Sequence, residues 1–82
     1  MNSQPVPDSL RNLLADTFGI SPHEVTPELS SETLEVWDSF AHLQAILALE
    51  GEYGVQFDPQ RIPELTSVAK IQTALASKGV TL

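Results

Sequence analysis

The sequence has 82 residues, of which 41% are hydrophobic, and a formal net charge of −7 from eleven acidic and four basic side chains. A chain of this length forms one domain with a modest core, which leaves little room for an enclosed substrate pocket and argues against a self-sufficient enzyme. Cysteine is absent, so disulfides, thiol nucleophiles and thiolate metal sites are excluded. The acidic balance disfavours nucleic acid as a partner.

The N-terminus shows no basic segment followed by an apolar core, and no apolar run is long enough to span a membrane. We therefore expect a soluble, cytoplasmic protein. Residues 1–7 contain two prolines among small polar side chains, and they are expected to be flexible, as are residues 80–82. The predicted domain spans residues 8–79.

The first predicted helix begins with Asp8 as its N-cap and ends at Gly19. It carries apolar side chains at helical spacing, namely Leu10, Leu13, Leu14 and Phe18. From Ile20 to Trp37 the periodicity is lost and prolines and serines accumulate, which predicts a long loop with one capped turn at residues 26–29. Apolar side chains are expected to anchor this loop to the core: Val25, Leu29, Leu34 and Trp37.

Residues 38–53 form the strongest predicted helix, with Asp38 as N-cap and Gly54 just past the end. Pro59 is expected to begin a short helical turn that Pro63 cuts off, pinned to the core by Ile62 and Leu65. Thr66 or Ser67 can cap a final helix that ends near Lys78 and Gly79, with apolar residues Val68, Ile71 and Leu75. The prediction is an all-α fold, a small four-helix bundle of three main helices and one short helix, with a long loop between the first two.

At about 100° per residue, the apolar side chains of the helix over 38–53 fall on two adjoining arcs that Glu50 divides. We expect one arc to face the core, with Ile46, Leu49 and Tyr53 inward and His42 near its start. The other arc is then an exposed docking surface, formed by Phe40, Leu43 and Leu47 and rimmed by Glu50. The alternative is that all six apolar side chains pack inside against the long loop.

Ser39 stands where the loop becomes this helix, so its hydroxyl is expected to be exposed. The backbone N–H groups of the first turn and the positive end of the helix dipole favour a phosphate attached there. Taken alone, however, Asp38 followed by Ser39 is fully explained as a plain helix start.

The context adds to this, because residues from Leu10 to Gly79 occur in the order and spacing of a known family. They are Leu13-Leu14, Phe18-Gly19-Ile20, Leu34, Trp37-Asp38-Ser39-Phe40, Leu43, Ala48-Leu49-Glu50, Tyr53-Gly54-Val55, Phe57, Ile62, Ser67-Val68 and Ile71. In these positions the chain resembles the acyl carrier protein and peptidyl carrier family.

The resemblance implies that Ser39 bears 4′-phosphopantetheine, supplied from coenzyme A by a separate phosphopantetheinyl transferase, and that Asp38 is the acidic residue before it. An acyl or aminoacyl group would then ride on the arm as a thioester, with no catalysis by this chain. The recognition positions of the family fall on Phe40, Leu43, Leu47 and Glu50. The implied partners are the transferase, an acyl or aminoacyl ligase or synthase, and acceptor enzymes with basic docking surfaces, and we expect a monomer.

Three positions depart from the pattern of fatty-acid-synthesis carriers, where acidic residues are common: Ala41, Gln44 and Gly51. Phe40 also replaces the commoner leucine. These departures favour a specialised pathway of lipid or secondary-metabolite biosynthesis over a housekeeping role.

No Lys or Arg lies between Arg11 and Arg61, although many acidic residues do. They are Asp16, Glu24, Glu28, Glu32, Glu35, Asp38, Glu50, Glu52 and Asp58. The negative field that they produce either steers the protein toward basic surfaces or simply keeps it dissolved.

Two other functions fit the sequence less well than a carrier does. A hydrolytic set of Ser39, His42 and either Asp38 or Glu35 lacks a nucleophile elbow and an oxyanion site. A metal site that combines Glu50, Glu52 or Asp58 with His23 or His42 lacks recognisable ligand spacing, so we expect no metal. The remaining alternative is an unmodified acidic docking or inhibitor domain that uses the same surface without an arm.

Overall fold

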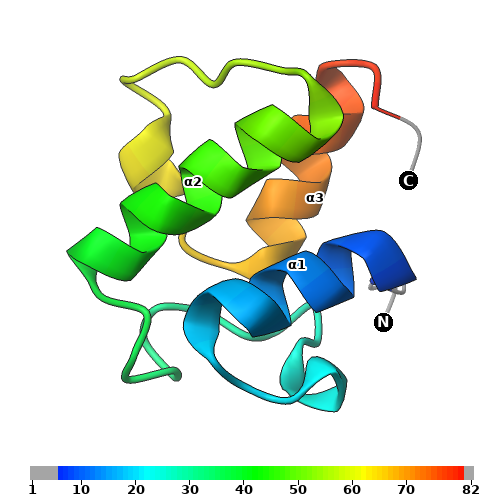
Figure 1. Cartoon of the computed structure of the whole chain (residues 1–82). Coiled ribbons are helices and arrows are strands. Elements are labelled where there is room, and N and C mark those ends of the chain that lie inside the picture. The colour runs from blue at the N-terminus through cyan, green and yellow to red at the C-terminus, as the bar shows by residue number, and fades with distance from the viewer. Residues whose placement is uncertain (1–5, 81–82) are drawn as a thin grey trace.

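The computed structural model describes residues 6–80, and within them it has three α-helices and two short 3-10 segments (Figure 1). In chain order they are α1 (Asp8–Phe18), η1 (Pro22–Glu24), α2 (Ser39–Tyr53), η2 (Ile62–Glu64) and α3 (Val68–Ser77). This part of the chain contains no strand, only an isolated antiparallel bridge between Ser30 and Ser67. The fold is therefore all-helical, as predicted.

The start of α1 differs from the prediction. Its N-cap is Pro7, which makes no side-chain cap hydrogen bond, and Asp8 is already the first helical residue. The reason is that the Pro7 carbonyl accepts the N–H of Arg11 at 2.8 Å, so the helical hydrogen bonds begin one residue earlier. The Asp8 carboxylate still lies in the first turn, where the helix dipole favours it. Gly19 ends the helix as predicted, with a φ of 69°.

Residues 19–38 connect α1 to α2 without an α-helix. Val25 and Trp37 are buried there, and Leu29 and Leu34 are half-buried against the core, which confirms the predicted anchors. The turn at residues 26–29 is present, closed by the N–H of Leu29 on the carbonyl of Thr26 at 3.1 Å. The Leu29 carbonyl also accepts the N–H of Val68 at 2.9 Å, which ties the connection to the start of α3.

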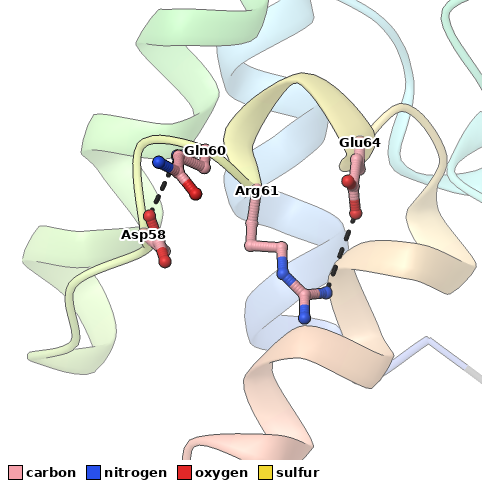
Figure 2. A network of polar contacts seen from close by, with 4 residues as sticks. All are labelled: Asp58, Gln60, Arg61 and Glu64. Carbon is pink, nitrogen blue, oxygen red and sulfur yellow. Dashed lines mark hydrogen bonds and ion pairs between the residues drawn. The ribbon is translucent and has the colours of Figure 1, made fainter.

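The connection from α2 to α3 begins at Gly54, whose φ of 65° ends α2 as predicted. The predicted short helical segment begins at Ile62 and not at Pro59, because residues 59–61 form a turn that Asp58 closes. The Asp58 Oδ1 accepts the N–H of Gln60 at 2.9 Å, and its carbonyl accepts the N–H of Arg61 at 2.8 Å. In place of a fourth α-helix, the single turn η2 follows, with Pro63 in its first positions. Figure 2 shows this segment, including an exposed ion pair of 3.7 Å between Arg61 and Glu64.

The N-cap of α3 is Ser67, whose hydroxyl accepts the N–H of Lys70 at 3.1 Å. Between the two predicted caps, Thr66 and Ser67, the structure therefore selects the serine. The apolar stripe of this helix is fully buried, as predicted: Val68, Ile71 and Leu75.

One core joins all three helices, with α1 packed against α2 and the connection 19–38 closing one side (Figure 1). At its edges Val6 is buried and Val80 packs against the same core. The outer parts of the predicted flexible ends, residues 1–5 and 81–82, lie outside the described residues. None of the helices between residues 6 and 80 has both the length and the apolar character needed to cross a membrane.

Candidate functional site

Ser39 is the first residue of α2, and it is exposed. Asp38 precedes it as the N-cap in extended conformation, and its Oδ1 accepts the N–H of Ala41 at 2.9 Å. This cap fixes the start of a 15-residue helix, whose N-terminus presents N–H groups and the positive end of the dipole. The serine hydroxyl therefore lies at an accessible, anion-favouring position.

His42 and Trp37 lie on either side of this serine along the chain and are joined by a hydrogen bond. The indole Nε1–H of Trp37 donates to His42 Nδ1 at 3.0 Å. Because Nδ1 accepts, the ring proton belongs on Nε2, which lies 2.7 Å from the carbonyl oxygen of Ile62 and donates to it. His42 is half-buried, as predicted for the inward arc.

These contacts argue against the hydrolytic set. Both ring nitrogens of His42 are engaged, one by Trp37 and one by Ile62, so neither is directed to Ser39 as a base. The Asp38 carboxylate is engaged by the backbone of its own helix. A surface groove lies between the α2–α3 connection and α3, with Phe57, Leu65 and Ala74 in its lining, and Ser39 does not line it.

The apolar residues of α2 divide as predicted between the core and the surface. Ile46 and Leu49 are 2% and 0% exposed, and Tyr53 is half-buried with its hydroxyl 3.0 Å from that of Ser9. The other arc, which we call the apolar patch, is 70%, 53% and 67% exposed at Phe40, Leu43 and Leu47 respectively. The alternative in which all six pack inside is therefore wrong.

Sequence reasoning missed one exposed hydrophobic residue in the connection before α2. Val36 is 49% exposed, three residues before Ser39. Among the described residues, the exposed large hydrophobic side chains are thus confined to residues 36–47, around the start of α2. The signal in the sequence is a lone valine between an acidic residue and a tryptophan, outside any helical periodicity.

Glu50 has a contact that the helical projection did not anticipate. Its side chain is half-buried, and Oε2 accepts the backbone N–H of Phe57 at 2.8 Å. The carboxylate therefore ties the α2–α3 connection to the end of α2. No local pattern reveals this pair, because the two residues are seven positions apart and belong to different segments.

The acidic side chains between Arg11 and Arg61 are exposed, apart from the half-buried Glu50. Glu32, Glu35 and Asp38 belong to the segment that leads into Ser39. The approach to the serine is consequently negative, which attracts basic protein surfaces at low ionic strength. Within residues 6–80 no group of three or more His, Asp or Glu side chains is placed to hold a metal ion, and His23 lies exposed in η1.

No protein-family model matches the chain, but two curated proteins are similar to it over nearly its whole length. An acyl carrier protein of Thermosynechococcus vestitus is 29% identical over 79 residues, which cover 95% of this chain and 96% of the relative. An acyl carrier protein of Nitratidesulfovibrio vulgaris is 30% identical over 71 residues, which cover 87% of this chain and 90% of the relative. The similarity thus extends across the whole domain and is not confined to the residues around Ser39.

Proposed function

The chain belongs to the acyl carrier protein family, a family of carriers and not of enzymes, and on that basis we propose that Ser39 is the attachment point of a 4′-phosphopantetheine arm. The observation that carries the proposal is the exposed hydroxyl on the first residue of α2, directly after the Asp38 cap. A phosphodiester at this position meets the helix N-terminus and so needs no basic side chain beside it.

The residues of this chain bind and present the arm, and the chemistry of attachment is left to a phosphopantetheinyl transferase. An ester bond forms between the Ser39 hydroxyl oxygen and the phosphorus that bears pantetheine, the pyrophosphate bond of coenzyme A breaks, and adenosine bisphosphate leaves. The serine proton passes to the transferase, because the ring nitrogens of His42 are both engaged elsewhere. When bound, the arm supplies a terminal thiol that carries an acyl or aminoacyl group as a thioester.

We further propose that the apolar patch is where partner enzymes dock. Phe40, Leu43 and Leu47 expose more than half of their surface, directly after the attachment residue. An apolar centre with a charged rim is the usual composition of a protein interface. The partners that fit this surface are the transferase, an acyl or aminoacyl ligase or synthase, and acceptor enzymes with basic docking surfaces, and Glu50 lies at its edge.

The same surface bears on the choice of pathway. Ala41, Gln44 and Gly51 place no charge on α2, so the acidic rim comes chiefly from the connection that precedes the helix. Partner enzymes that bind acidic residues along α2 would meet fewer of them here than on fatty-acid-synthesis carriers. This supports a specialised pathway of lipid or secondary-metabolite biosynthesis, in which the chain acts as a cytoplasmic monomer.

Intact mass spectrometry tests the attachment directly. The purified chain is incubated with coenzyme A and a broad-specificity phosphopantetheinyl transferase, and we expect a gain of one arm's mass. Ser39→Ala removes the gain. Ser77→Ala, a change of another exposed helical serine, keeps it.

The alternative, an unmodified acidic docking or inhibitor domain, predicts the opposite result in the same experiment. A folded wild-type chain that gains no mass, or one that gains it equally in Ser39→Ala, contradicts the carrier proposal. The apolar patch would then be the functional surface on its own.

A further inference from the structure

The residues on the two sides of Ser39 are joined to each other and to two other parts of the fold. We propose that His42 is a positioning residue for the modification of Ser39, holding the serine-bearing turn in the one arrangement that the transferase can use. This inference rests on the proposed attachment at Ser39.

The linkage joins the chain segments before and after the serine. Trp37 lies two residues before Ser39 and His42 three residues after it, and the hydrogen bond of 3.0 Å between their side chains spans residues 38–41. The two rings meet edge to edge, with centroids 6.2 Å apart and planes inclined by 25°. The turn that presents the serine is therefore braced from both of its ends.

Each end of the brace is fixed to a different element. The Trp37 indole is buried and lies 4.6 Å, between ring centroids, from Phe18, the last residue of α1. His42 is held by the Ile62 carbonyl in η2, at 2.7 Å. The exposed serine turn is thus connected to α1 on one side and to the α2–α3 connection on the other.

Such a brace matters because helix ends open at low cost. Terminal turns lie at the least stable end of local unfolding, and Ser39 is the first residue of its helix. The apparent affinity of a partner that recognises only the closed turn is proportional to the fraction of molecules that are closed, so it falls as the turn opens. Loss of the brace should therefore raise the KM of the transferase for this chain and leave kcat nearly unchanged, because the bound complex is the same.

The His42 ring offers one hydrogen-bond acceptor, Nδ1, and one donor, Nε2–H. Among other residues, glutamine offers the same pair from its amide oxygen and nitrogen. Phenylalanine fills the space of the ring but offers neither. His42→Gln is consequently the conservative variant and His42→Phe the disruptive one.

The experiment measures the initial rate of arm transfer from saturating coenzyme A by a broad-specificity phosphopantetheinyl transferase, with the concentration of the chain varied. It is run at a temperature where urea titration shows every variant to be folded. His42→Phe should raise KM about threefold to tenfold with kcat within a factor of about two. His42→Gln should recover most of the wild-type KM.

A destabilising change far from the linkage is the control. Ile71→Val trims a fully buried side chain of α3, and it should lower stability without moving KM. If His42→Phe does not fold, Trp37→Phe replaces it, since it keeps a ring against Phe18 and removes the indole donor, and the same rise in KM is expected.

The inference is overturned if the folded His42→Phe chain, or Trp37→Phe in its place, is modified with the wild-type KM. It is equally overturned if His42→Gln is as impaired as His42→Phe, or if Ile71→Val raises KM to the same extent. Failure of the proposed function has a different signature, because the wild-type chain would then accept no arm at any concentration.

Discussion

The Glu50 carboxylate accepts the backbone N–H of Phe57 at 2.8 Å, across the end of α2. The carbonyl of the same residue accepts the N–H groups of Gly54 at 2.9 Å and Val55 at 3.3 Å. Glu50 therefore controls how the chain leaves α2. The direction of that exit brings Phe57 into the core, where it is 5% exposed.

Glu50→Ala should accordingly lower the free energy of unfolding, because it leaves the part-buried N–H of Phe57 without an acceptor. Such a loss costs about 1–3 kcal/mol, whereas Glu50→Gln keeps an oxygen in reach and should cost less. Urea titration followed by the fluorescence of the single tryptophan measures both. The control is Glu52→Ala, an exposed neighbour that should change stability by at most ~0.5 kcal/mol. Equal losses at the two positions would contradict the structural role of Glu50.

Gly51 and Gly54 should respond oppositely to alanine. Gly51 lies inside α2, and a Cβ there meets nothing within 4 Å, so alanine should raise the free energy of unfolding by up to about 1 kcal/mol. Gly54 has a φ of +65°, where an L side chain costs about 1–2 kcal/mol, so alanine should destabilise. Thermal and urea unfolding of the two variants decide the matter, and two changes of the same sign would be incompatible with this backbone.

Asp38 should stabilise α2 through its cap. Asp38→Ala removes the acceptor for the N–H of Ala41 and should cost about 1 kcal/mol, whereas Asp38→Asn keeps a capping oxygen and should cost little. Amide hydrogen exchange is the sharper measurement, because the loss of protection should concentrate in the first turn of α2. Uniform loss across α3 as well would mean that the cap is not what holds this turn.

The sequence predicts α2 and its site well because the signals there are local. Asp38 and Gly54 bound the helix through contacts within four residues of themselves, and 3.6-residue periodicity separates Leu47 from Leu49. The inward position of His42 follows from the same projection. The exposure of Ser39 then follows from its place directly after the cap.

The sequence does not predict the structural features that depend on contacts outside the local pattern. The short helical segment begins at Ile62 and not at Pro59, because the Asp58 side chain and carbonyl close a turn over residues 59–61. The contacts of His42 with Trp37 and Ile62 join three segments of the chain. Periodicity reports which face of a helix is buried, but it does not report which polar atoms meet beneath it.

The last prediction concerns the apolar patch. Leu47→Glu should leave the free energy of unfolding within ~0.5 kcal/mol of wild type, because the side chain is 67% exposed. Leu49→Ala, two residues along, should lose about 2–5 kcal/mol, because Leu49 is fully buried.

For docking we expect the opposite order, with the larger effect from the change at Leu47. In the transferase assay Leu47→Glu should raise KM at least about fivefold, as expected for an apolar anchor at an interface. Gln44→Glu adds the same charge at an exposed position of α2 without removing an apolar side chain, so it separates the loss of the anchor from the added charge. A large loss of stability in Leu47→Glu would place this residue in the core. A wild-type KM would place it outside the docking surface, because a side chain that contacts the transferase affects the KM when it is replaced.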